Sequence, residues 1–80
     1  LMLVGDYKDA IIVIEKAVKS HERAELYYQL SNCYLNLGNE EKGQEALKIA
    51  LELDATLSDD MQQKYPYIKD QVKKVKSKKK

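Results

Sequence analysis

The sequence has few of the residues from which catalytic and metal sites are built. Its 80 residues include one histidine and one cysteine, and they contain no glycine-rich phosphate-binding motif. Cys33 has no second cysteine with which to form a disulfide bond within the chain, and we expect a small buried side chain there. His21 lies in a polar stretch without a second histidine or cysteine at metal-binding spacing. We therefore expect no enzymatic activity, no cofactor and no small-molecule substrate.

Residue patterns of β-strands and membrane spans are also lacking. The chain has one proline and three glycines, and 34% of its residues are charged. No apolar run is long enough to cross a bilayer, and no stretch alternates between apolar and polar residues as an exposed strand does. Eighty residues make at most one small domain, near the lower limit for a stable single core. These features predict an all-α domain.

Residues 24–55 show the strongest helical pattern. Their apolar side chains recur every three or four positions, which places them on one face of a helix. The first stripe is Tyr27, Leu30, Tyr34 and Leu37, and the second is Gly43, Leu47, Ala50 and Leu51. Between the stripes, Gly38 can adopt the left-handed conformation that ends a helix, and Asn39 can cap the next one. The pattern predicts helices over 24–37 and 40–53, joined as an antiparallel hairpin.

The second half of this hairpin has an upstream copy. A shift of 33 residues aligns Gly5 with Gly38, Ala10 with Gly43, Ile14 with Leu47 and Ala17 with Ala50. The copy predicts a helix over 7–20 with Asp6 as its N-cap. Self-similarity at this period indicates an array of stacked helical pairs. By the same register, residues 1–4 are the end of an earlier helix, so we interpret the chain as the C-terminal piece of a longer array.

At these positions the chain resembles the tetratricopeptide repeat family. The matching residues are Tyr27, Leu30, Ser31, Tyr34, Gly43, Leu47, Ala50 and Ala55. Three of them depart from the family pattern, because Gly43 replaces alanine, Leu47 an aromatic residue and Ala55 proline. The small side chains fit positions where packed helices approach closely, at about 8–10 Å between axes. The resemblance covers about residues 1–57 and implies hairpins stacked as an α-solenoid.

The chain after Asp54 follows a different pattern. Ser58 is expected to be an N-cap. A narrow apolar seam then follows, formed by Met61, Tyr65, Ile68, Val72 and Val75. Pro66 predicts a kink or short break near Lys64 and Tyr65, with a new helix starting at the proline. We therefore predict about one and a half repeats plus a C-terminal capping helix: a half repeat at 1–22, a full repeat at 24–57, the cap at 58–76 and a disordered basic tail at 77–80.

The resemblance implies a protein-interaction scaffold whose partner is a protein or peptide. In the family, the first helix of each repeat lines a concave groove that takes a peptide or a helix. By register the groove positions are Glu25, Tyr28, Gln29, Asn32, Leu35 and Asn36. Two alternatives remain open for them. Either they are ordinary exposed helix residues, or the capping helix covers them.

Self-association is a second functional interpretation. The predicted helix over 7–20 is apolar almost all round, which is typical of a helix covered on more than one side. The residues that we expect at a homo-oligomer contact are Ile11, Ile12 and Val13. An isolated exposed isoleucine is the alternative, and it is common on protein surfaces.

Charge is distributed unevenly along the chain. Residues 69–80 contain seven lysines and one aspartate, a net charge of +6, which leaves −5 for residues 1–68 in a chain of net charge +1. Such a run can bind a polyanion or an anionic membrane surface. The candidate contacts are Lys73, Lys74, Lys76, Lys78, Lys79 and Lys80. Because no aromatic residue is interleaved with these lysines, we favour a solvated tail, and nucleic acid and membrane are not our preferred partners.

Overall fold

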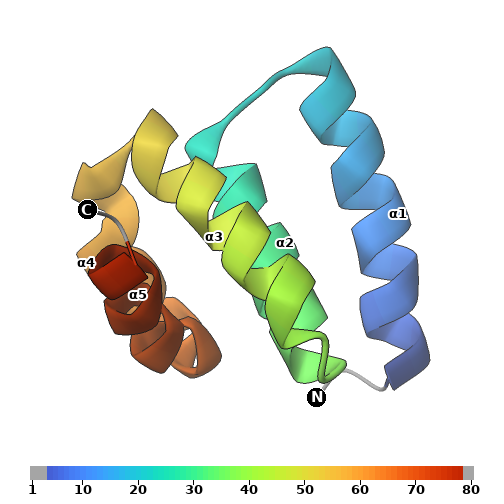
Figure 1. Cartoon of the computed structure of the whole chain (residues 1–80). Helices are drawn as coiled ribbons and strands as arrows, with labels where there is room; N and C mark the ends of the chain where they lie inside the picture. Colours follow the sequence, from blue (N-terminus) through green and yellow to red (C-terminus); the bar gives the residue numbers. More distant parts are fainter. Residues whose placement is uncertain (1–3, 79–80) are drawn as a thin grey trace.

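The computed structural model describes the backbone of residues 4–78 and the side chains of residues 6–76. The elements along the chain are α1 (Val4–Ser20), α2 (Ala24–Asn36), α3 (Glu40–Leu53), the 3₁₀-helix η1 (Ala55–Leu57), α4 (Ser58–Lys64) and α5 (Pro66–Lys78). Successive helices α1, α2 and α3 lie side by side in antiparallel order (Figure 1). Over the described residues the predicted all-α class, with neighbouring helices packed as in a helical repeat, is confirmed.

The start of α1 differs from the prediction. The helix begins at Val4 and continues through Gly5 and Asp6, so Asp6 lies in the first turn and is not the N-cap. A glycine permits the left-handed conformation of a turn but does not require it, and Gly5 continues the helix. Each residue that continues a helix adds a backbone hydrogen bond, so the helix extends. Residues 1–3, which we expected to end an earlier helix, lie outside the described residues.

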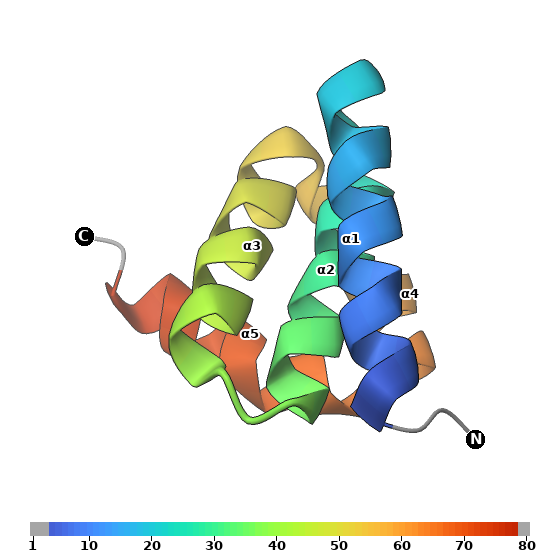
Figure 2. The same ribbon diagram turned by 90° about the vertical axis from the view of Figure 1, so that its right-hand side faces the viewer.

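The turn between α2 and α3 has the predicted geometry (Figure 2). Gly38 has a φ of 85°, in the left-handed region that glycine adopts without a steric penalty. The N–H of Asn39 donates to the carbonyl oxygen of Tyr34 at 2.9 Å, which satisfies an otherwise unpaired group at the end of α2. Asn39 then caps α3, because its Oδ1 accepts from the N–H of Lys42 at 3.2 Å. The sequence pattern at this turn is therefore confirmed.

Small side chains allow α2 and α3 to approach closely. Ser31 is fully buried, and its Oγ donates to the carbonyl oxygen of Gly43 at 2.6 Å. Leu47 and Ala50 on α3 are also fully buried. Ridges-into-grooves packing tolerates only short side chains at such a crossing. The small positions that the repeat pattern predicts, Ser31, Gly43 and Ala50, are therefore buried in the packed hairpin.

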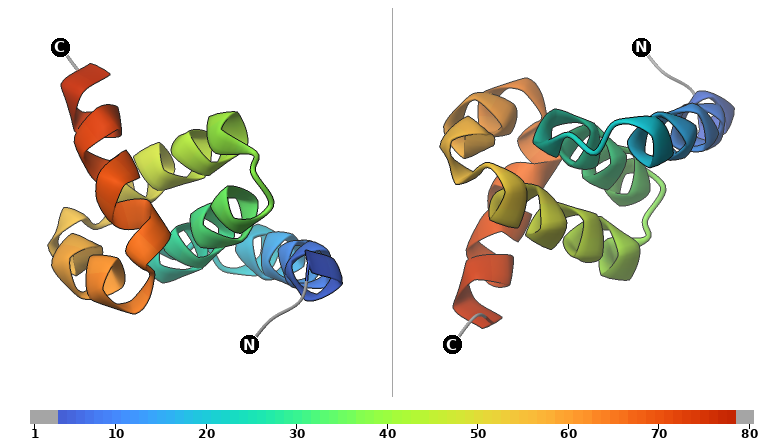
Figure 3. Two further views of the ribbon diagram at one scale, coloured as in Figure 1. Left: turned by 90° about the horizontal axis from the view of Figure 1, so that it is seen from below. Right: turned by 90° about the horizontal axis from the view of Figure 1, so that it is seen from above.

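The described residues form two core clusters on opposite sides of the α2–α3 hairpin. One lies between α1 and the hairpin, and its buried members are Ile11, Leu30, Cys33 and Ala46. The other lies between the hairpin and the C-terminal helices, and its buried members are Ala24, Tyr28, Leu47, Ala50, Met61, Ile68, Val72 and Val75. Figure 3 shows α5 crossing the hairpin on the side away from α1. The hairpin is thus covered on two faces.

The segment after α3 is capped by a residue other than the expected one. Asp54 Oδ1 accepts from the N–H of Thr56 at 3.0 Å and so caps η1. Ser58 is already helical and buried, and its Oγ accepts from Gln62 Nε2 at 2.9 Å. The prediction that Ser58 is an N-cap is therefore wrong. The 3₁₀ turn leads directly into α4, which leaves no extended residue at position 58 to act as a cap.

The break at Pro66 lies where the sequence predicts it. α4 ends at Lys64, Tyr65 is non-helical with φ −125° and ψ 87°, and Pro66 is the first residue of α5. Proline has no backbone N–H to donate, and this loss has no cost in the first turn of a helix. α5 extends to Lys78, so two residues that we expected in a disordered tail are helical. Lys79 and Lys80 lie outside the described residues.

Candidate interaction surface

Tyr28, the aromatic residue of the predicted groove, lies in the core. Its side chain has 0% exposure and belongs to the cluster shared with Ile68 and Val72 of α5. The hydroxyl donates to the carbonyl oxygen of Asp54 at 3.0 Å, so the polar end of the ring is satisfied inside the protein. The groove contact that we predicted for Tyr28 is therefore corrected. Its alternative, coverage by the capping helix, describes Tyr28 in this structure.

Leu35 also packs inward from α2. It is half-buried against the cluster that includes Tyr28. A Cβ atom added at Gly43 would lie 2.6 Å from Leu35 Cδ2, well inside van der Waals contact. Leu35 thus occupies the space that an alanine at position 43 would require. An alanine at position 43 would therefore require the flexible end of the Leu35 side chain to shift.

The remaining four predicted groove residues form a half-buried polar row on α2. We call this the α2 row, and it consists of Glu25, Gln29, Asn32 and Asn36. Within it, Asn36 Nδ2 donates to the Asn32 carbonyl oxygen at 2.8 Å and to Asn32 Oδ1 at 3.0 Å. These bonds fix the orientation of the two amides relative to the helix. The α2 row is therefore an ordered polar surface between packed elements.

The predicted self-association residues separate into two groups. Ile11 is 8% exposed and packs inside the cluster between α1 and α2, so its predicted intermolecular contact is corrected. Ile12 and Val13 have exposures of 54% and 65%. The three residues differ because successive positions of an α-helix turn by about 100°, so only one of them faces α2. For Ile12 and Val13 the contact stays a prediction.

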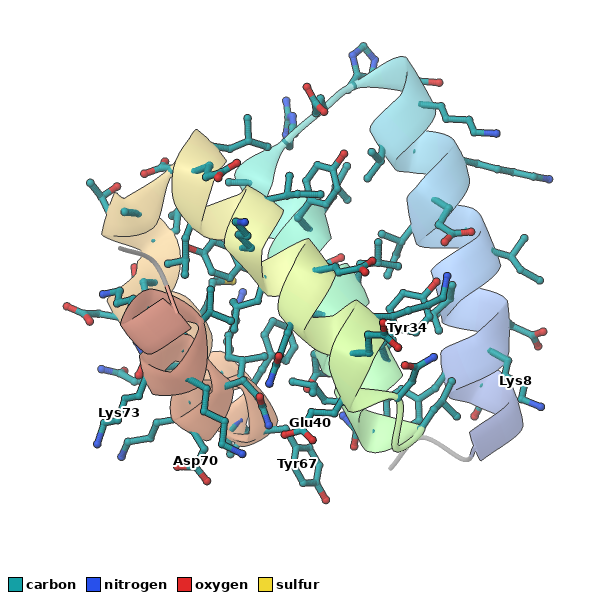
Figure 4. All side chains as sticks on the ribbon, in the orientation of Figure 1. Lys8, Tyr34, Glu40, Tyr67, Asp70 and Lys73 are labelled. Carbon is teal, nitrogen blue, oxygen red and sulfur yellow. The ribbon has the colours of Figure 1, made fainter. Side chains whose placement is uncertain are left out.

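The lysines of α5 are on the surface. Lys73, Lys74 and Lys76 are exposed, and Figure 4 shows Lys73 pointing away from the other helices. Lys74 Nζ lies 3.1 Å from Glu40 Oε2, which also accepts from Gln71 Nε2 at 2.9 Å. The charge of Lys74 is thus partly neutralised by the start of α3. Lys78 is the last residue of α5, and the structure does not describe its side chain. Lys79 and Lys80 lie outside the described residues.

The sequence did not reveal a groove of about 380 Å³ between α3, η1 and α5. Leu51, Ala55 and Val75 supply its apolar surface. Glu45 and Glu52 are among the charged residues that line it. Leu51 and Val75 were recognised as members of apolar stripes, but no local signal shows that the stripes leave a space between them. That space depends on where α5 crosses the hairpin.

Among residues 4–78, no group of three or more histidine, cysteine, aspartate or glutamate side chains is placed to hold a metal ion. Cys33 is buried as expected, and burial raises the pKa of its thiol, which disfavours the reactive thiolate. His21 is exposed in the link between α1 and α2. No helix in this part of the chain has the length and hydrophobicity of a membrane span.

Three tyrosines connect α2 to its surroundings through their hydroxyls. Tyr34 donates to Glu15 Oε2 of α1 at 2.9 Å, and Tyr27 donates to Glu22 Oε2 at 3.1 Å. Burial, followed by the neighbouring carboxylates, raises the pKa of both phenols. Burial, followed by the charge of Asp54, raises the pKa of Tyr28. In each case the surroundings favour the protonated phenol over the phenolate.

We expect the free energy of unfolding to fall as the pH rises above 10. The unfolded chain releases its phenol protons near the ordinary pKa of 10.0, whereas the folded chain retains them to higher pH. The stabilisation is fully present below pH 10 and is lost as the pH rises through the folded pKa values. Urea unfolding between about pH 8 and about pH 11 measures this loss. A variant with phenylalanine at Tyr27, Tyr28 and Tyr34 should show a flatter profile, and an unchanged profile would contradict the assignment.

The comparisons with known proteins agree with this geometry. A tetratricopeptide repeat family model matches residues 24–57, the segment that contains α2, α3 and η1. Neither the curated proteins nor the solved structures gave a significant match. Tetratricopeptide repeats are in general protein-interaction modules, typically non-catalytic, whose partners are proteins. The hairpin, its small-residue crossing and the family match together identify residues 24–57 as a tetratricopeptide repeat.

Proposed function

We propose that the chain is a non-catalytic module that binds a peptide or helix of another protein along the α2 row. The observation that carries this proposal is the partial solvent exposure of the α2 row. The other faces of α2 are covered, because α1, α3 and α5 pack against them. The buried Tyr28 and the half-buried Leu35 support the row from beneath and do not contact the partner. In this proposal the binding surface is smaller than the groove expected from the sequence.

The chemistry of the α2 row suits a peptide backbone. An amide side chain both donates and accepts hydrogen bonds, as a backbone peptide group does. The bonds from Asn36 to Asn32 hold two such amides in fixed positions, which lowers the entropy lost on binding. Glu25 adds a carboxylate near the start of α2, where it can pair with a basic side chain of the partner. We therefore expect the bound segment to offer backbone groups along Asn32 and a lysine or arginine near Glu25.

The test is a selection of binding peptides on the immobilised full chain from a random peptide library. Selected peptides should shift the amide and side-chain NMR signals of the α2 row. Truncating one interface side chain typically costs about 1–2 kcal/mol when it carries binding energy. We therefore expect Gln29→Ala and Asn32→Ala each to raise the Kd about tenfold. Binding should also change little between about 50 and 200 mM salt, whereas phosphate-type binding through the lysines would fall steeply.

Matched controls come from α3. Lys48→Ala and Glu52→Ala alter exposed residues that line the groove between α3 and α5. These variants should bind the selected peptides as the unmodified chain does. If they weaken binding while Gln29→Ala and Asn32→Ala do not, the partner occupies the groove between α3 and α5 and the proposal for the α2 row is wrong.

A further inference from the structure

One face of α1 is not covered by another element in the described part of the chain. α1 packs on α2 through Ile11 and its neighbours, and the opposite side faces solvent at the edge of the molecule (Figure 2). We call this side the outer face of α1, and it consists of Asp6, Asp9, Ile12, Val13, Lys16 and Lys19, all exposed. Ile12 and Val13 are 54% and 65% exposed, among the most exposed large apolar side chains in the described part of the chain.

The charges on the outer face are arranged symmetrically about the apolar pair. Asp9 precedes Ile12 by three positions, and Lys16 follows Val13 by three. At 3.6 residues per turn, these four side chains fall within an arc of about 100°. Asp9 and Lys16, seven positions apart, are therefore about 10 Å apart along the axis and lie on the same side of the helix. Along the helix, the midpoint between Asp9 and Lys16 coincides with the midpoint between Ile12 and Val13.

This arrangement is complementary to a second copy of α1 that runs in the opposite direction. A twofold axis through the midpoint would place Asp9 opposite the lysine at position 16 of the other copy, and Lys16 opposite its aspartate at position 9. Ile12 would face the valine at position 13 in the same way. A twofold contact uses the same patch on both molecules, so each favourable pair occurs twice. In a parallel arrangement the like charges would face each other.

We propose that the outer face of α1 is a homodimer contact in which two α1 helices pair antiparallel, with Ile12 and Val13 at the centre and the Asp9 and Lys16 pairs on either side. Acids near the start and lysines near the end of a helix also complement its dipole. The dipole does not account for two aliphatic side chains exposed to water between them. Burial of this pair supplies the attraction, and the charges determine the direction.

The contact is small. A standard protein–protein interface buries about 1,600 Å², and a single helix face provides less than that. The dimer should therefore be weak and form at the upper end of the micromolar range or above. This proposal is independent of partner binding along the α2 row, and the two can fail separately.

Sedimentation velocity of the full chain across a concentration series tests the proposal. The unmodified chain should associate to a dimer. Asp9→Lys places lysine opposite lysine twice in each dimer, and Lys16→Asp places aspartate opposite aspartate. Each should raise the dimer Kd more than about tenfold. An equimolar mixture of the two variants should dimerise again, because every facing pair then has opposite charges. The double variant Asp9→Lys with Lys16→Asp should also dimerise.

The four residues substituted in this test are exposed: Asp9, Lys16, Ile12 and Tyr67. The helical circular dichroism signal should therefore be the same in every variant. Ile12→Glu should abolish association, whereas Tyr67→Glu, at an exposed aromatic on α5, should leave it unchanged. A monomer at every concentration of the unmodified chain would overturn the proposal. Association that survives Asp9→Lys, or variants that fail to dimerise when mixed, would overturn it as well.

Discussion

Tyr28→Ala is expected to lower the free energy of unfolding by about 3–5 kcal/mol. The variant removes a fully buried ring from the cluster between α2 and α5, together with the hydrogen bond to the Asp54 carbonyl oxygen. A single core of this size contributes about 3–5 kcal/mol of net stability, so the variant should be largely unfolded at 25 °C. Circular dichroism at 222 nm during urea unfolding measures the loss.

Two companion variants separate the role of the ring from that of its hydroxyl. Tyr28→Phe keeps the ring and loses one hydrogen bond, so it should cost about 1 kcal/mol. Tyr67 is 61% exposed and points away from the helices (Figure 4), so Tyr67→Ala should change stability by about 0.5 kcal/mol or less. If the Tyr28→Ala chain is as stable as the Tyr67→Ala chain, Tyr28 lies at the surface of the predicted peptide-binding groove, as expected from the sequence.

The second large effect is expected at Ile68, the fully buried residue of α5. Ile68→Ala should lower the free energy of unfolding by about 2–5 kcal/mol, because it leaves a cavity in the cluster that holds α5 against α2 and α3. The polar contacts of α5 cannot compensate for this loss. The ion pair between Lys74 and Glu40 is more than half exposed on both sides, and such pairs contribute about 0–1 kcal/mol.

Trypsin cleavage measures the docking of α5 directly. Trypsin cleaves slowly after exposed lysines of a docked helix, because the helix must unfold locally before the chain can enter the active site of the protease. Ile68→Ala should speed cleavage after Lys73 and Lys74 at least tenfold, in step with the lost stability. Glu40→Gln, which removes one charge from the ion pair, should change the rate little. Equal cleavage rates in the Ile68→Ala chain and the unmodified chain would contradict the assigned packing.

The turn residues show how a local pattern can depend on distant contacts. Gly38 and Asn39 form the predicted turn because α2 and α3 pack on each other, with Ser31 bonded to Gly43. Gly5 and Asp6 repeat the same pattern, yet α1 is helical through both. A glycine permits the left-handed conformation but does not require it. The contact between the two flanking helices selects it.

The α2 row shows the same dependence for the candidate site. The family register assigned Glu25, Gln29 and Asn32 to the groove, and the period of the helix puts these three residues on one side of α2. Whether Tyr28 belongs to that surface depends on α5, which begins 38 positions later at Pro66. The apolar seam of α5 indicated that it must be covered, but not by which residues. Its crossing over Tyr28 and Leu47 therefore changed a predicted contact into core.

Sequence patterns alone predict the helical segments and the break at Pro66, because these follow from residues within a few positions of one another, and the 33-residue register indicates the repeat pattern of the hairpin. The packing of the helices against one another determines that Tyr28 is core, that Ile11 faces inward while Ile12 and Val13 face water, and that a groove remains between α3 and α5. This difference follows from the range of the forces involved. Backbone hydrogen bonds and helical periodicity act over about one turn. Apolar burial joins residues that are distant in the sequence, and it favours the arrangement that covers the most surface.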